Sequence, residues 1–218
     1  MTLLSYEPPL QPFISIIYAD ADIVVINKQS GLLSVPGKAP EHRDSAWSRL
    51  ERVLPDLRVV HRLDMATSGV MVFARHKQAQ AALQRQFEQR LVGKRYRAHV
   101  WGQPPSTKGE INLALRCDWP NRPRQMVDLN LGKAARTLYE VTGQHQHGAI
   151  VALTPYTGRS HQLRVHMQAV GCAILGDKFY APPVAFAAAP RLLLHAEYLA
   201  FNQPINQQPL SFSCSADF

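Results

Sequence analysis

The sequence predicts an α+β fold with a central mixed, largely antiparallel sheet flanked by helices. Several segments rich in β-branched and aromatic residues follow one another without a helix between them, which favours antiparallel pairing over a doubly wound parallel sheet. Apolar residues recur at helical spacing in only a few segments. One hydrophobic core can serve a chain of 218 residues, so we expect residues 1–218 to form a single domain.

Strands and helices alternate in the N-terminal part of the chain. Residues 13–28 are rich in Ile and Val and predict two short strands, separated by turn formers at Asp20–Asp22. Asp44 is expected to cap a helix that Pro55 closes. Residues 69–74 predict the next strand, because they form an apolar run after a cluster of turn formers.

The remaining elements begin with the clearest helix. Residues 77–91 have an apolar residue at every fourth position and basic residues on the other faces, and Gly93 is expected to end this helix. A break rich in Pro and Gly at 102–109 is the expected division between two sub-lobes around a cleft. Further strands are predicted at 96–100, 110–115, 134–142, 149–154, 192–200 and 210–213.

Composition limits the class of protein. The chain is 46% hydrophobic and 18% charged and has no apolar run of the length that a membrane span requires. Its start, MTLLSYEPPL, lacks the basic and apolar regions of a secretory signal, which predicts a cytoplasmic location. Cys117, Cys172 and Cys214 are odd in number and far apart, so neither a disulfide framework nor a CxxC pair is expected. The net charge of +8 favours a polyanionic partner.

The common motifs for phosphate binding, nucleophilic catalysis and zinc binding do not occur in the sequence. It contains no GxxxxGK[ST], no GxGxxG and no GxSxG. His161 and His166 are five residues apart, unlike the i, i+4 pair of a HExxH helix, so no zinc site is predicted. Chemistry carried by a carboxylate remains.

One carboxylate lies in unusually basic, turn-bounded surroundings. The segment HRLDMATSGV (61–70) places Asp64 after two basic residues and before a turn expected at 67–69. Asp64 is either a catalytic acid or half of a structural ion pair with Arg62. The segment alone leaves both interpretations open.

A second segment complements the first. In TGRSHQLRVH (157–166), Ser160 is expected to cap a helix that carries Arg164 near its start. By itself this segment is equally consistent with an ordinary capped helix.

Taken together, these segments resemble a known family. HRLDMATSG, KRYRAHVWG and GRSHQLRVHM, in this order, resemble the three signature motifs of the RluA-type pseudouridine synthases. ILGDKFY (174–180) and RLLLHA (191–196) are similar to further blocks of that family, so the resemblance runs from about residue 24 to residue 200. The chain departs from the family pattern at KQSG (28–31), where Lys-Pro-Ser-Gly is usual, and at GCA (171–173), where Gly-His-Pro is usual. Both departures affect loop geometry and remove no catalytic group.

The resemblance implies a pseudouridine synthase fold and three catalytic residues. Asp64 would be the nucleophile on a flipped-out uridine, attacking either the base or the sugar. Arg164 would pair with this carboxylate and keep it charged in a site closed to water. Tyr96 would stack on the target uracil.

The resemblance also implies a set of residues that bind the substrate. Arg62 would fill the space that the flipped base leaves, with His61 beside it. The stretch CDWPNRPRQ (117–125), which carries Trp119 and Arg122, is expected to be a rigid loop that faces RNA. Further expected contacts to the substrate are Leu193, Lys94 and Arg159, and the basic side chains expected to follow phosphates are Lys77, Arg85, Arg90, Arg95 and Arg97.

RNA is therefore the expected partner, as 23S rRNA and as the tRNA anticodon stem-loop. We expect a monomer that has no separate N-terminal RNA-binding domain and needs no obligate protein partner. We also expect that it needs neither a metal nor a cofactor. Two alternatives are a non-catalytic RNA-binding or ribosome-assembly protein with the same fold, and an N-glycosidase that would release the free base.

Overall fold

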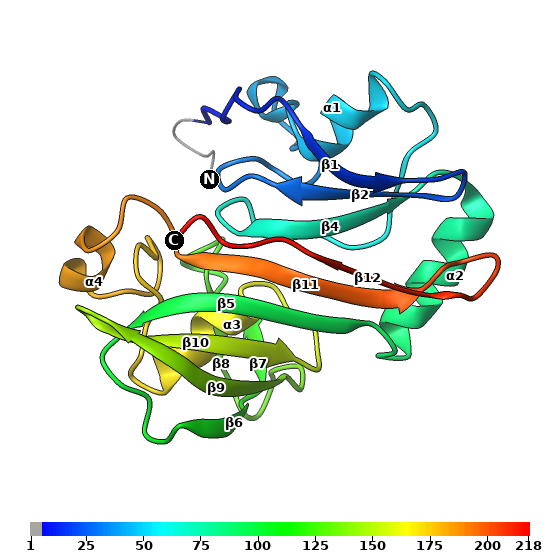
Figure 1. Ribbon diagram of the computed structural model, residues 1–218. Coiled ribbons are helices and arrows are strands. Elements are labelled where there is room, and N and C mark those ends of the chain that lie inside the picture. Colours follow the sequence, from blue (N-terminus) through cyan, green and yellow to red (C-terminus); the bar gives the residue numbers. More distant parts are fainter. Residues whose placement is uncertain (1–5) are drawn as a thin grey trace. The chain divides into compact units, whose positions relative to one another are not determined.

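The computed structural model describes residues 6–218, which divide into two compact units (Figure 1). The continuous unit is Arg95–His195 together with Phe218, and the discontinuous unit consists of the described residues up to Lys94 and of Ala196–Asp217. The expected division at 102–109 is therefore wrong, because this break lies inside the continuous unit. Its residues 102–107 connect the strands Gly93–Trp101 and Lys108–Asn112, and its last two residues already belong to the second strand. The absence of a secretory signal was inferred partly from residues 1–5, which lie outside the described residues.

The sheet of the discontinuous unit contains the two strands expected at 13–28. Its strands are arranged in the order β1-β2-β4-β11, with β3 beside β4 and β12 beside β11. The pairs β1–β2, β2–β4, β3–β4 and β11–β12 are antiparallel. The bounds are β1 Ser15–Ala19, β2 Ile23–Lys28, β3 Arg58–Val59, β4 Ser68–Ala74, β11 Leu194–Asn202 and β12 Pro209–Ser213. The helical elements are η1 Pro40–His42, α1 Ala46–Glu51 and α2 Lys77–Glu88.

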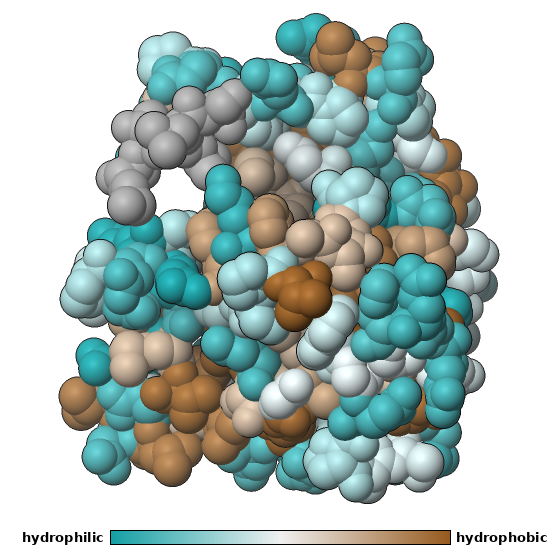
Figure 2. Space-filling model, turned by 90° about the vertical axis from the view of Figure 1, so that its left-hand side faces the viewer, coloured by the Kyte–Doolittle hydropathy of each residue, from teal (hydrophilic) through white to brown (hydrophobic). Residues whose placement is uncertain are grey.

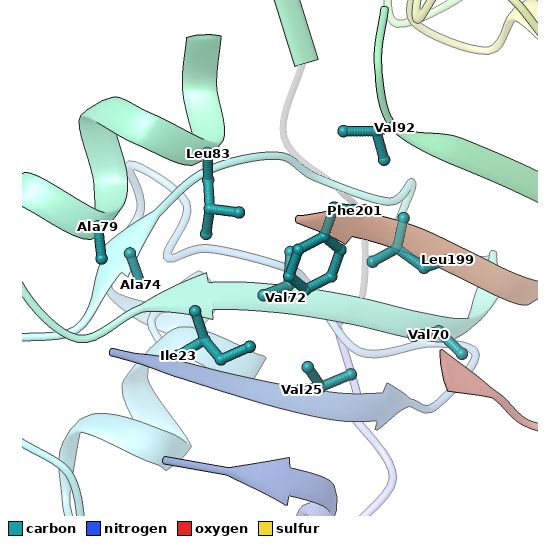
Figure 3. Packing of buried hydrophobic residues seen from close by; sticks show 10 residues of the cluster. All are labelled: Ile23, Val25, Val70, Val72, Ala74, Ala79, Leu83, Val92, Leu199 and Phe201. Atoms are coloured by element: carbon teal, nitrogen blue, oxygen red, sulfur yellow. The ribbon is translucent and has the colours of Figure 1, made fainter. Parts of the chain in front are cut away.

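The core of this unit lies between α2 and the sheet (Figure 3). Ala79 and Leu83 of α2 pack against apolar side chains of β2, β4 and β11. Every residue of β4 is buried, which explains why its sequence is a continuous apolar run instead of an alternating one. The helix ends at Glu88, three residues before the predicted end, and Leu91 is 64% exposed.

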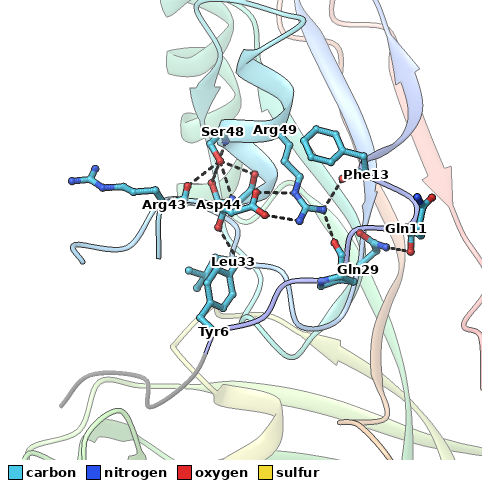
Figure 4. Close-up of polar contacts among 11 residues, drawn as sticks. Tyr6, Gln11, Phe13, Gln29, Leu33, Arg43, Asp44, Ser48 and Arg49 are labelled. Atoms are coloured by element: carbon cyan, nitrogen blue, oxygen red, sulfur yellow. Dashed lines mark hydrogen bonds and ion pairs between the residues drawn. The ribbon is translucent and has the colours of Figure 1, made fainter. Parts of the chain in front are cut away.

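The start of α1 differs from the prediction. Ser45, and not Asp44, is the N-cap: its hydroxyl accepts the Ser48 N–H, and the Ser48 hydroxyl accepts the Ser45 N–H in return. Asp44 instead forms a two-bond ion pair with the buried Arg49, at 2.6 and 2.8 Å (Figure 4). Hydrogen bonds from this guanidinium lower the pKa of the Asp44 carboxyl. Arg49 also donates to the Phe13 carbonyl, which ties α1 to the chain before β1.

The continuous unit is built on four consecutive antiparallel strands in the order β5-β10-β9-β6. A separate hairpin, β7–β8, was not predicted, because its strands have only three residues each. The bounds are β5 Gly93–Trp101, β6 Lys108–Asn112, β7 Leu115–Cys117, β8 Gln125–Val127, β9 Arg136–His145 and β10 Gly148–Pro155. The helices are α3 Gln162–Ala169 and α4 Pro183–Ala187. The predicted α+β class with a largely antiparallel sheet is confirmed.

The surface exposes several large apolar side chains. Figure 2 shows one face, on which hydrophobic residues reach the surface between hydrophilic ones. In the continuous unit, Trp119, Leu129 and Leu131 are 63%, 70% and 75% exposed. Over residues 6–218, no helix has the length and apolar character needed to span a membrane.

Candidate active site

The Asp64 segment lies between β3 and β4 in the discontinuous unit. Asp64 is partly exposed, and its carbonyl accepts the Thr67 N–H at 3.1 Å, which closes a tight turn. The turn therefore spans 64–67 and not 67–69 as predicted, since Ser68 and Gly69 already belong to β4. The acid lies at the first position of the turn.

The loop of residues 28–34 fixes the backbone on both sides of Asp64, and we name it the cradle loop. The Ser34 hydroxyl donates to the Leu63 carbonyl at 2.7 Å and accepts the Leu63 N–H at 3.1 Å. The Met65 carbonyl accepts the Gly31 N–H at 2.9 Å. Because these bonds go to the main chain, they set the position of Asp64 without contacting its carboxylate.

Two further bonds from the cradle loop complete this support. The Ser30 hydroxyl donates to the Ala66 carbonyl at 2.7 Å. Lys28 is fully buried, and its ammonium donates to the carbonyls of Gln29, Leu32 and Met65. A buried charge of this kind requires polar partners, which the three carbonyls supply. Gln29, which replaces the usual proline, donates its side-chain amide to the Gln11 carbonyl (Figure 4).

His61 and Arg62 precede the acid and have different environments. The His61 ring stacks on Phe87 with ring centroids 4.7 Å apart, and its Nε2 accepts the Val72 N–H of β4 at 3.1 Å. Burial, and secondarily the charge of Lys94, lowers the pKa of His61 to about 3, so the ring is a neutral acceptor. Arg62, in contrast, is exposed. Burial also lowers the pKa of Lys94.

Arg164 lies on α3 in the continuous unit, where it pairs with a residue that the sequence analysis missed. Its Nε and Nη2 donate to the two carboxylate oxygens of Asp177, both at 2.7 Å. The two side chains are 4% and 0% exposed. Asp177 also accepts the N–H groups of Phe179 and Tyr180. A buried carboxylate with these donors holds the guanidinium in one orientation.

The start of α3 corrects a second predicted cap. Ser160 does not cap the helix; the N-cap is His161, in a left-handed conformation with φ 53° and without a side-chain capping bond. The Gln162 side chain instead binds the segment before the helix, because its Oε1 accepts the Arg159 N–H and the Thr157 hydroxyl. These bonds hold residues 157–159 against the first turn of α3 but do not cap it.

The other expected residues of this unit lie on separate elements. Tyr96 is partly exposed on β5, opposite Leu153 of β10. Leu193 is 9% exposed and packs with Leu175 and Ala185. Arg159 is exposed, and its Nε donates to the Ala134 carbonyl at 3.1 Å.

Trp119 and Arg122 lie on the exposed connection between β7 and β8, which we name the hairpin loop (118–124). The Arg122 guanidinium is 4.2 Å from the centre of the Trp119 ring. The Asp118 N–H donates to the Arg124 carbonyl at 3.0 Å, which closes the base of the loop. The loop therefore presents an aromatic face and cations on a braced backbone, the combination that unpaired nucleotides favour.

Over residues 6–218, no three His, Cys, Asp or Glu side chains are close enough together to hold a metal ion. In the described part of the chain, Cys117, Cys172 and Cys214 form no disulfide bond.

Comparison with known proteins decides the family. The model of the RNA pseudouridylate synthases matches residues 22–169, which include the Asp64, Tyr96 and Arg164 motifs. The chain belongs to this family. As a pseudouridine synthase it isomerises uridine in RNA.

Curated relatives match this pseudouridine synthase over its whole length. It is 54% identical to the dual-specificity RNA pseudouridine synthase RluA of Pasteurella multocida, with both chains fully covered. It is 52% identical to the protein of the same name from Escherichia coli K12, again over the full length of both. The resemblance noted in the sequence is thereby confirmed.

Solved structures of the same family share the fold. Human RNA pseudouridylate synthase domain containing 1 superposes with a TM-score of 0.79 at 29% identity, covering 97% of this synthase and 87% of the human chain. Human RNA pseudouridylate synthase domain containing 4 gives 0.74 at 27% identity, covering 92% and 88%. The predicted pseudouridine synthase fold is confirmed.

Two supporting groups of the synthase escaped sequence reasoning. Asp177 lies in the ILGDKFY block, and this block was the available signal, although nothing in it identified Arg164 as the partner. Ser34 and its bonds to Leu63 left no sequence signal, because a serine in a loop is ordinary.

Proposed function

We propose that this synthase modifies uridines of 23S rRNA and of the tRNA anticodon stem-loop, with Asp64 as the nucleophile. The observation that carries the catalytic assignment is the cradle loop, which fixes Leu63, Met65 and Ala66 around the acid. Catalytic groups need such support, because a small displacement of a reacting atom lowers the rate strongly. The two relatives are named dual-specificity RNA pseudouridine synthases, which supports two RNA substrates.

The reaction is an isomerisation in which the uracil is detached and turned. The bond from C1′ to N1 breaks and a bond from C1′ to C5 forms. C5 loses its proton to solvent and N1 gains one, so the product has the mass of the substrate. The Asp64 carboxylate attacks either C6 of the base or the sugar; both routes need it charged and oriented.

In this proposal Arg164 orients the nucleophile. Its Nε and Nη2 bind Asp177, and the same guanidinium is proposed to donate to Asp64. A guanidinium beside a carboxylate favours the charged form of the acid and limits its orientations.

Arg62 and Tyr96 act on the RNA in this proposal. A uridine inside a stem or a folded loop must leave the stack before a side chain can reach it, at a cost of a few kcal/mol. The exposed Arg62 would occupy the space that the base vacates. Tyr96 would stack on the flipped uracil, an interaction worth about 1–3 kcal/mol per base.

The test is tritium release from RNA labelled at uridine C5. Wild-type protein should release tritium to water from a 23S rRNA transcript and from a tRNA transcript, whereas Asp64→Asn should release none above background. Loss of C5 hydrogen at equal rates with the variant would refute Asp64 as the nucleophile. Release from one transcript only would refute dual specificity, and free uracil among the products would indicate an N-glycosidase.

Arg62→Ala tests the base-flipping assignment. Its affinity for the same transcripts should be within a few-fold of wild type. Its rate of tritium release should be lower by a factor of about ten or more, because no side chain fills the space that the flipped base leaves. Undiminished turnover would refute the role of Arg62.

The substrates also suggest location and assembly. Both RNAs serve translation, so we infer a cytoplasmic protein. We further infer that it acts as a monomer, and a sedimentation mass of 24.4 kDa, that of one chain, is the expected result.

A further inference from the structure

The Tyr180 hydroxyl joins the hairpin loop to the start of α3. It accepts the Gln125 N–H at 2.8 Å, at the residue where the hairpin loop enters β8. It also lies 2.6 Å from Nδ1 of His161, the N-cap of α3. A hydroxyl can accept the first bond and donate the second when the imidazole is neutral. One buried oxygen therefore contacts both elements.

The backbone and ring of the same tyrosine contribute to the setting of Arg164. The Tyr180 N–H donates to the carboxylate of Asp177, which binds Arg164 through two hydrogen bonds. The rings of Tyr180 and Phe179 lie 5.1 and 5.3 Å from the Arg164 guanidinium carbon. A shift of residues 177–180 would therefore move the guanidinium with it.

His161 adds an unusual backbone conformation to this junction. Its φ of 53° is uncommon for a residue other than glycine, and its ring is stacked with that of Phe179 at an angle of 16°. Such conformations persist when the surroundings hold them, and they concentrate at functional sites. The hydroxyl of Tyr180 and the ring of Phe179 both contact the imidazole.

The hairpin loop is suited to transmit the binding of RNA to Tyr180. Its Trp119 is 63% exposed, with Arg122 against the ring, and Arg124 lies 5.8 Å from the ring of Tyr180. A nucleotide stacked on Trp119 would shift the hairpin loop, and the end of this loop is hydrogen-bonded to Tyr180.

We propose that Tyr180 is a positioning residue that links RNA bound at the hairpin loop to the orientation of Arg164. This inference rests on the proposed function, since it assumes that Arg164 orients Asp64. Tyr180 contacts neither RNA nor the reacting atoms in this scheme. Its loss should therefore change the rate of the bound complex and leave affinity for RNA nearly unaltered.

The first experiment is Tyr180→Phe, assayed in single turnover with tritiated tRNA transcript. At saturating RNA the rate should fall about tenfold while Kd changes less than about twofold, because a hydrogen bond is lost and the ring stays. Tyr156→Phe is the matched control: it removes a hydroxyl from an exposed tyrosine of the same unit and should leave both quantities unchanged. A wild-type rate for Tyr180→Phe, or a loss confined to Kd, would overturn the proposal.

A double-mutant cycle tests the connection to the loop. Trp119→Ala should raise Kd and also lower the rate at saturating RNA, but it should lower the rate no further when Tyr180 is already Phe. Rate factors that multiply in the double variant would overturn the link. Should Tyr180→Phe fail to fold, His161→Asn takes its place, because asparagine tolerates the left-handed backbone and withdraws the ring from the hydroxyl.

Asp64→Asn distinguishes a failure of the proposed function from a failure of the link through Tyr180. If this variant keeps the wild-type rate, the proposed function has failed and the Tyr180 scheme fails with it. If it is inactive while Tyr180→Phe and His161→Asn both turn over at the wild-type rate, only the link through Tyr180 is overturned.

Discussion

Gly176 is the residue whose replacement the backbone tolerates least near Arg164. It immediately precedes Asp177 and has φ +71°, and a Cβ at this position would overlap the Arg191 carbonyl. Gly171, at the end of α3, has φ +80°, but a Cβ there would meet no atom within 4 Å. The two glycines thus share a left-handed conformation and differ in the space around them.

We expect Gly176→Ala to be much more harmful than Gly171→Ala. The latter should lower the free energy of unfolding by about 1–2 kcal/mol, the cost of a left-handed alanine. Gly176→Ala should cost at least about 3 kcal/mol, because its backbone neighbours must move as well, and Asp177 moves with them. Urea unfolding followed by circular dichroism measures both. Equal losses would contradict the steric explanation.

His61 should make stability dependent on pH. Its pKa is about 3 in the folded protein and about 6.5 in the unfolded chain. Between these pH values the unfolded chain binds a proton at His61 that the folded protein does not bind. The stabilisation is complete above pH 6.5 and is lost as pH falls toward 3, with a slope of up to about 1.4 kcal/mol per pH unit.

The measurement compares wild type with His61→Gln, whose amide oxygen can still accept the Val72 N–H. Urea unfolding at pH 7 and at pH 5 should show a larger decrease for wild type than for the variant. Identical pH dependence would mean that His61 is solvated and protonated normally in the fold.

Among the elements, the cradle loop is short but should strongly affect the catalytic rate. Ser34→Ala removes both hydrogen bonds to Leu63 and leaves buried polar groups without partners, which should cost about 1–3 kcal/mol of stability. The rate at saturating RNA should fall as well, because the backbone before Asp64 is released. Ser211→Ala, at an exposed position of β12, is the control and should change neither. Lost stability with a full rate would show that the acid does not need this support.

The sequence predicted elements with strong patterns and failed where two residues compete for one role. The apolar runs and helical spacing gave β1, β2, β4 and α2 with errors of a few residues. Caps were misassigned because Asp44 and Ser45 are both good capping residues, and because α3 begins one residue later than expected, at a His161 N-cap without a side-chain capping bond. Strands of two or three residues, such as β3, are shorter than any periodic pattern.

Parts of the candidate site were beyond sequence reasoning for a different reason. The bond between Arg164 and Asp177 joins residues of two motifs, and the Ser34 bonds join residues 29 positions apart. Such pairs are defined by tertiary packing and have no local pattern. The family motifs gave candidate residues, whereas the groups that hold them came only from the structure.

At the scale of the whole molecule, the net charge of +8 should make RNA binding sensitive to salt. Each phosphate contact adds roughly −0.7 to −0.9 to the slope of log affinity against log salt. Lys77→Gln, on the exposed face of α2, should reduce the magnitude of the slope by about 1 if this lysine meets a phosphate.

Lys108→Gln is the matched control, because this exposed lysine is paired with Glu140 at 2.7 Å. Both variants lower the net charge equally, so filter-binding titrations at several salt concentrations separate a local contact from a general field. Equal slopes for the two variants would contradict a phosphate contact at Lys77.

The cradle loop forms its hydrogen bonds with main-chain carbonyls and N–H groups, so it places few demands on the side chains of the residues that it holds. Because Lys28, Ser30 and Ser34 bind the backbone of residues 63–66, the side chains at Met65 and Ala66 carry none of the bonds just described. The turn at Asp64 can therefore exchange these neighbours while keeping its shape. In a randomised library selected for activity, diversity should concentrate at 65 and 66, with little tolerated at 34.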